Sequence, residues 1–128
     1  MDQDPGQDHA SVRYIVDDVD AAIAFYTDLL GFTVLSHPAP AFADVVRGHL
    51  RLLLSGPPSS GARATPPEEA GPGRNRIHLV VDDLDAHLER LREAGATFRS
   101  DVVEGPGGRQ FLVADPAGNL VEIFQPAG

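Results

Sequence analysis

Hydrophobic residues along the chain first follow the spacing of a strand and then the spacing of a helix. Residues 12–16 alternate, so that valine and tyrosine side chains fall on one face, as in a half-buried strand. Ile23, Tyr26 and Leu30 then recur at intervals of three or four residues, which is typical of an amphipathic helix. Gly31 follows, and glycine commonly ends a helix. The pattern predicts a strand followed by a helix that packs on the strand's apolar face.

This strand–helix unit occurs twice. Ile77–Ala86 repeats Val12–Ala21 with an offset of 65 residues, and its helix ends at Gly95. A second similarity aligns Gly48–Leu54 with Gly118–Phe124. An internal repeat of this length indicates two copies of one structural module. Aspartates at 17–20 and 82–85 precede both helices and are interpreted as helix caps, because neither run continues as a calcium-binding loop.

The remaining segments complete the same order in each copy. We expect a flexible tail at 1–10, a first module at 11–55, a connector at 56–75 and a second module at 76–126. The connector is rich in proline and glycine and is interpreted as a linker, with a lid over a cleft as the alternative. Further strands are expected at 32–35, 42–47, 49–54, 97–102, 109–114 and 120–124, and turns at 37–40, 105–108 and 115–119.

Composition excludes several classes of protein. The chain of 128 residues suits one compact domain, and 42% hydrophobic residues suffice for a core. It contains no long apolar run, no recognisable signal peptide and no cysteine, so we expect a cytoplasmic protein that does not enter a membrane. The net charge of −9 argues against binding to nucleic acid. It favours a cationic ligand or serves solubility alone.

The duplicated order and three motifs resemble the vicinal oxygen chelate superfamily, which groups glyoxalase I, extradiol dioxygenases, fosfomycin-resistance enzymes and bleomycin-resistance proteins. The motifs are Val16–Phe32, Val80–Gly95 and Asp115–Ile123. The resemblance implies an α+β fold in which two β-α-β-β-β modules form curved mixed sheets around a shared cleft. It also implies a homodimer, often with exchanged modules.

The resemblance further implies which strand faces line the cleft. In each module the first strand presents its more polar face there, which gives one set of candidate positions. The last strand of the second module adds Glu122 and Phe124, and the alignment of Gly48 with Gly118 adds Leu52. The predicted ligand-binding residues are Arg13, Ile15, Leu52, Arg76, His78, Glu122 and Phe124.

Metal-dependent members of this superfamily place ligands at positions that correspond here to Ser11, Leu52, Arg76 and Glu122. Only Glu122 suits a divalent cation, because leucine cannot coordinate one and arginine repels it. His78 lies two residues from a vacant position, so a divalent metal held by His78 and Glu122 is the alternative to a metal-free site. Arg76 and Glu122 are expected either to pair with each other or to bind opposite charges on a ligand.

The sequence therefore predicts a metal-free protein that binds a small organic ligand, with no catalytic residues assigned. Sequestration of an antibiotic, as in bleomycin resistance, is the leading hypothesis. A metal-dependent lyase or dioxygenase of the glyoxalase type with a rearranged site is the alternative. A degenerate domain kept only for assembly is a third hypothesis.

Overall fold

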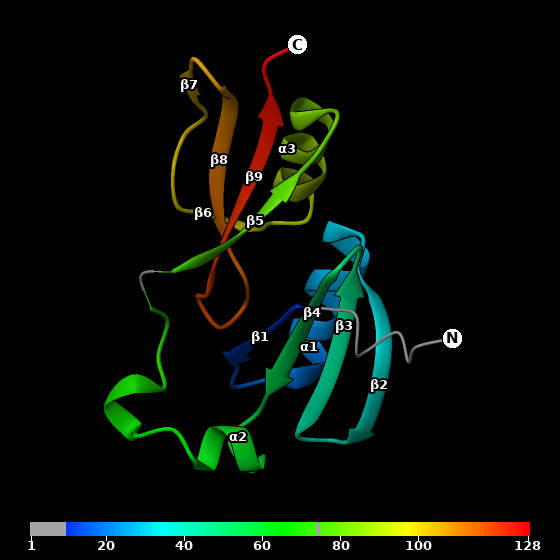
Figure 1. The fold of residues 1–128 in the computed structure, drawn as a ribbon, viewed down its shortest axis with the longest axis vertical. Helices are drawn as coiled ribbons and strands as arrows, with labels where there is room; N and C mark the ends of the chain where they lie inside the picture. The colour runs from blue at the N-terminus through cyan, green and yellow to red at the C-terminus, as the bar shows by residue number, and fades with distance from the viewer. Residues whose placement is uncertain (1–9, 74) are drawn as a thin grey trace. The chain divides into compact units, whose positions relative to one another are not determined.

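The computed structural model describes residues 10–73 and 75–128, and the chain divides into two compact units. The units are Met1–Gly71 and Pro72–Gly128, so the boundary falls inside the predicted connector. The predicted tail lies outside the described residues, except that Ala10 already belongs to the first strand. Figure 1 shows the elements of each unit in order along the chain.

The first unit is a mixed four-stranded sheet with one helical segment in its first crossover. Its strands lie in the order β1-β4-β3-β2, with β1 parallel to β4 and the other pairs antiparallel. Helix α1 contacts β3 and β4 and covers one face of the sheet. The elements are β1 Ala10–Ile15, α1 Val19–Ala24, the π-helical turn η2 Phe25–Leu29, β2 Thr33–Ala39, β3 Phe42–Arg47 and β4 Leu50–Ser55.

The second unit repeats this arrangement. Its strands lie in the order β5-β9-β8-β6, with β5 parallel to β9, and β7 pairs with β8 beside β6. The predicted α+β fold with two mixed sheets is confirmed. The elements are β5 Arg76–Val80, α3 Leu84–Glu93, β6 Thr97–Phe98, β7 Val103–Gly105, β8 Gly108–Ala114 and β9 Leu120–Pro126.

Aspartate caps start α1 and α3, as predicted. The Asp18 side chain accepts a hydrogen bond from the Ala21 backbone N–H at 3.0 Å, and Asp83 accepts one from Ala86 at 3.1 Å. Each side chain satisfies a backbone N–H that the first turn leaves without a helical partner. The two aspartate runs are therefore explained by helix initiation.

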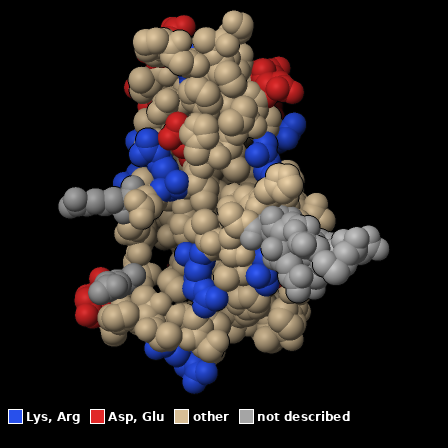
Figure 2. Space-filling view, viewed as in Figure 1, with Lys and Arg blue, Asp and Glu red and all other residues tan. Residues whose placement is uncertain are grey.

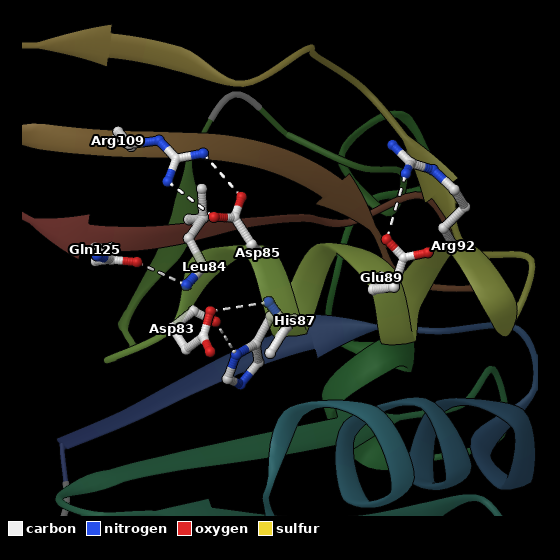
Figure 3. A network of polar contacts seen from close by, with 9 residues as sticks. Asp83, Leu84, Asp85, His87, Glu89, Arg92, Arg109 and Gln125 are labelled. Carbon is white, nitrogen blue, oxygen red and sulfur yellow. Dashed lines mark hydrogen bonds and ion pairs between the residues drawn. The ribbon is translucent and has the colours of Figure 1, made fainter.

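Additional polar contacts fasten the start of α3 to its sheet (Figure 3). The Leu84 backbone N–H donates to Gln125 Oε1 of β9 at 2.7 Å. Arg109 of β8 binds Asp85 through both terminal nitrogens, at 2.9 and 3.3 Å. The hydrogen bonds and positive charge of Arg109 hold the pKa of Asp85 below its ordinary value. These contacts keep α3 on one face of the sheet and leave the other face open.

We expect Asp85→Asn to destabilise the protein near neutral pH by a small amount, since the pair is exposed. A carboxyl whose pKa is lowered by folding stabilises the fold above its unfolded pKa, which is about 4 for aspartate. That contribution disappears as the pH falls through the lower pKa of the folded state. The unfolding midpoints of wild type and variant, measured by circular dichroism across this range, should therefore converge in acid. Glu89→Gln, which removes an exposed pair to Arg92 at 3.8 Å, is the control, and a gap that persists in acid would contradict this account.

Each unit has its own apolar core between helix and sheet. In the first unit the helical segment contributes Tyr26 of η2, which packs edge-on against the rings of Phe25 and Phe32. In the second unit the fully buried side chains include Leu91 and Phe111. The apolar residues of β5 that were predicted to lie under the helix are buried there. They are Ile77, Leu79 and, just after the strand, Val81.

Two local predictions were wrong, and the connector contains short helical elements that were not predicted. The turn expected at 37–40 is shorter, because β2 continues to Ala39 and includes Pro38. Proline is tolerated there since β2 is an edge strand with register shifts against β3. The predicted connector includes the helix α2 Ser60–Arg63 and a 3₁₀ turn η3 at Pro67–Glu69. The strand expected at 97–102 is reduced to β6 at its start, and β7 begins only after the expected range.

Candidate functional site

The open face of the second unit carries the predicted polar residues of β5 and β9. The two strands are parallel and pair His78 with Glu122 and Val80 with Phe124. Paired residues on adjacent strands share a face, so these side chains lie together on the side opposite α3. His78 and Val80 are exposed, whereas Ile77 and Leu79, which alternate with them, are buried. The predicted division of faces is correct for this unit.

Glu122 is the charged centre of this open face. It is only 8% exposed, and its Oε1 accepts a hydrogen bond from Arg76 Nε at 2.9 Å. Its Oε2 lies 3.5 Å from His78 Nε2. The carboxylate is thus matched by an arginine, which is the first of the two alternatives left open for this pair. A nearly buried carboxylate needs such a partner, because burial without one is costly.

Aromatic surface lies next to this charged pair. The rings of His78 and Phe124 are 5.0 Å apart between centroids and are tilted by 37°. Phe124 is half-buried and Val80 is 51% exposed, so apolar surface remains accessible on this face. The combination of a flat ring, an imidazole and an arginine can bind an aromatic molecule that also carries hydrogen-bonding groups.

The open face of the first unit borders two hollows that the connector completes. Arg13 lies in a hollow of about 390 Å³ together with Phe42 of β3 and residues of α2. Ile15 lies in a second hollow of about 350 Å³ with Pro57, Ala62 and other connector residues. Both predicted residues of β1 therefore lie where a small molecule has room. The connector residues were not among the predicted ligand-binding residues, although Ser59 before a short polar run is a recognisable helix cap.

The prediction that Leu52 faces the open side is wrong. Leu52 is fully buried, and it pairs with Val12 on β1 and Val45 on β3, on the face covered by α1. Leu53 and Arg51 occupy the open face instead, opposite Arg13 and Ser11. The equivalent of Glu122 in the first unit is therefore Leu53, because a shift of one residue moves every side chain of a strand to the other face.

The observed register of β4 brings together a polar cluster that the sequence interpretation missed. Asp44 of β3 is 1% exposed, and Arg51 Nε donates to its Oδ2 at 2.6 Å. The Ser36 hydroxyl donates to the other carboxylate oxygen. Asp44 is thus neutralised by Arg51 as Glu122 is by Arg76. Nearby on the same face, Ser55 Oγ is buried and has no hydrogen-bond partner among the described residues.

The metal site implied by the resemblance does not fit the residues present. Leu53, which replaces Leu52 as the equivalent of Glu122, has no atom that coordinates a cation, and Arg76 places a guanidinium against the carboxylate. Neither unit, over its described residues, brings together three or more His, Cys, Asp or Glu side chains that could hold a metal. The donor set of this chain therefore differs from the one that metal chemistry in this fold requires.

Charge is dispersed on the surface. Figure 2 shows separate groups of arginine and of acidic side chains, with mostly uncharged surface between them on the face in view. All ten lysine and arginine positions of the chain are arginines.

None of the described helices has the length and apolar character needed to cross a membrane.

Comparison with known proteins identifies the family to which this fold and sequence are similar. The sequence profile of the Glyoxalase/Bleomycin resistance protein/Dioxygenase superfamily matches residues 6–123. A protein of Mycobacterium bovis with the printed name "Putative glyoxylase CFP32" is 28% identical over 115 residues, which cover 88% of this chain. The chain spans only 42% of the length of that relative.

Two relatives of similar size bear names that refer to antibiotics. The bleomycin resistance protein of Geobacillus stearothermophilus is 27% identical over 120 residues, covering 86% of this chain and 90% of the relative. The crystal structure of TnmS3, an antibiotic binding protein from Streptomyces sp. CB03234, superposes with a TM-score of 0.73 at 28% identity, covering 93% of this chain and 95% of that one. On the strength of the profile match and the repeated fold, the chain belongs to the Glyoxalase/Bleomycin resistance protein/Dioxygenase superfamily.

Proposed function

We propose that this protein binds a small organic molecule of the antibiotic type on the open faces of its sheets, without a metal, and sequesters it unchanged. The observation that carries the proposal is the Arg76–Glu122 ion pair at 2.9 Å. It engages the one carboxylate that the family's metal-dependent members would use as a ligand, while the same face keeps an aromatic ring and an imidazole accessible. The names of TnmS3, an antibiotic binding protein, and of the bleomycin resistance protein support a ligand of the antibiotic type.

Electrostatics at long range and at contact distance together indicate the charge of the ligand. A net charge of −9 attracts a ligand with positive charge at long range. At contact distance the open face of the first unit offers Arg13, whereas the carboxylates of Asp44 and Glu122 are already paired with Arg51 and Arg76. We therefore propose a ligand that carries a cationic part and also an acceptor or anionic part.

Protein treated with a chelator should be stabilised against heat by at least one member of a panel of aromatic natural products that includes bleomycin. Phe124→Ala should weaken binding of that compound by about three- to tenfold, the range expected for one aromatic contact. Val103→Ala, which truncates an exposed side chain of β7, is the matched control. Absence of stabilisation by every compound, together with stabilisation by a divalent metal, would overturn the proposal.

The second candidate function is a metal-dependent lyase or dioxygenase, and the 3.5 Å approach of His78 to Glu122 is the observation that favours it. For this function, purified protein should contain zinc, nickel, iron or manganese in stoichiometric amount, measured by elemental analysis. Glu122→Ala should then remove the metal. Retention of organic ligand binding in metal-free protein would exclude the need for such a site.

Assembly into a homodimer is part of the proposal, supported by the family resemblance. Light scattering coupled to size-exclusion chromatography should give twice the chain mass of 13.6 kDa. A mass of one chain at micromolar protein concentration would contradict this part alone.

A further inference from the structure

The hollow beside Arg13 differs from the rest of the open faces because its arginine forms no ion pair with the described residues. It has a volume of about 390 Å³ and lies within the first unit, between the sheet and α2. Its walls combine the guanidinium of Arg13 with the ring of Phe42, the apolar ring of Pro58 and the serines at 59 and 60. One side of the hollow is thus apolar and the other can donate hydrogen bonds.

Arg13 is not neutralised by any of the residues 10–73 and 75–128 that the structure describes. Arg51, Arg76 and Arg109 each form an ion pair at 2.9 Å or less. Arg13, by contrast, makes no ion pair and no side-chain hydrogen bond with any residue that the structure describes. Its five N–H donors are therefore available in a hollow that has room for a molecule.

Gly61 determines where this guanidinium lies. A Cβ atom added at Gly61 would approach Arg13 Nη1 to 1.7 Å and Cζ to 2.7 Å, so the guanidinium rests directly on the glycine backbone. The backbone at this point is held by the connector itself. Ser59 Oγ donates to the Gly56 carbonyl at 2.7 Å and accepts from the Ala62 N–H at 3.3 Å. The first turn of α2 thus acts as a support that orients Arg13.

We propose that this hollow binds the carboxylate of a planar aromatic molecule, with the carboxylate on Arg13 and the ring against Phe42 and Pro58. A planar guanidinium matches a carboxylate with two parallel hydrogen bonds, which are stronger than neutral ones. The inference rests on the proposed function in that the ligand is a small organic molecule, and it adds the chemical class of the group bound in the first unit.

Three naphthalene probes of equal size separate charge from shape: 2-naphthoate, neutral 2-naphthamide and 2-naphthylmethylammonium. The chain contains no tryptophan, so naphthalene fluorescence excited beyond the absorption of tyrosine reports on the probe alone. We expect 2-naphthoate to bind about tenfold more tightly than 2-naphthamide, as one charge-assisted contact predicts, and the cation to bind most weakly.

Arg13→Gln should abolish this preference for the carboxylate and leave the affinity for 2-naphthamide nearly unchanged. Arg92→Gln, which removes the same charge from an exposed position on α3, should preserve the preference. Gly61→Ala should reduce it without loss of thermal stability, because the displaced atoms are the far end of a flexible side chain and alanine favours a helix.

The outcomes distinguish this inference from the function itself. Equal binding of 2-naphthoate and 2-naphthamide by wild type, or an unchanged preference in Arg13→Gln, overturns the inference and leaves the antibiotic panel unaffected. No binding of any naphthalene probe to wild type also overturns it. A preference lost in Arg13→Gln and Gly61→Ala but kept in Arg92→Gln supports it, even if every compound of the natural-product panel fails.

Discussion

Leu52→Ala should lower the free energy of unfolding by about 2–4 kcal/mol, whereas Leu53→Ala should lower it by less than about 1 kcal/mol. Leu52 is fully buried between Val12 and Val45 on the covered face of the first sheet, so its truncation leaves a cavity. Leu53 lies on the open face and is only half-buried. Urea denaturation followed by circular dichroism measures both values.

The pair of variants is its own control, because the two residues are chemically identical and adjacent. A larger loss for Leu53→Ala would mean that β4 is shifted by one residue. The equivalence of Leu53 with Glu122 would then be wrong as well.

Asp115→Ala is the second variant with a large expected effect, a loss of about 2–4 kcal/mol of stability. Asp115 is 3% exposed, and its Oδ1 accepts hydrogen bonds from the backbone N–H groups of Ala117 at 3.0 Å and Asn119 at 2.7 Å. Its Oδ2 accepts a third from Asn119 Nδ2 at 3.1 Å. Removing the carboxylate leaves these donors without partners in the turn that leads into β9.

Asp101→Ala truncates an exposed aspartate of the same unit and should change stability by no more than about 0.5 kcal/mol. Asp115→Asn should be intermediate, because one amide oxygen remains as an acceptor. Thermal unfolding of the three variants tests this order. Equal stability of the two alanine variants would show that the turn does not depend on the carboxylate.

The fold was largely predictable because the sequence contains two copies of the same module. The strand and helix that recur at an offset of 65 residues predicted both crossover helices. The capping aspartates Asp18 and Asp83 predicted where these helices begin. Alternation also gave the faces of β5, where Arg76 and His78 stand between buried Ile77 and Leu79. In such a strand the polar residues identify the open face without ambiguity.

The register of β4 could not be read in the same way. Three consecutive leucines, Leu52 to Leu54, contain no alternation, so either face could be the buried one. Alignment of Gly48 with Gly118 then decided the register, although the turns that contain these glycines differ in length. Interactions between strands set the register, and a sequence comparison of single strands does not contain them.

The candidate site was predicted in part. The open faces carry most of the predicted residues, as the resemblance implied, namely Arg13, Ile15, Arg76, His78, Glu122 and Phe124. The ion pair of Asp44 with Arg51 was not predicted, because it depends on the register of β3 against β4. The contribution of Gly61 was not predictable either, since a glycine in a proline-rich segment gives no signal about which side chain will rest on it.

The absence of a Cβ atom at Gly61 has a consequence for how ligand preference could change during evolution. A single-base change from a glycine to an alanine codon would add a methyl group and displace the Arg13 guanidinium from its support. The hollow would then lose part of its preference for acids, with the scaffold unaltered. Position 61 is therefore where a lineage of such proteins could relax its selectivity for acids in a single step.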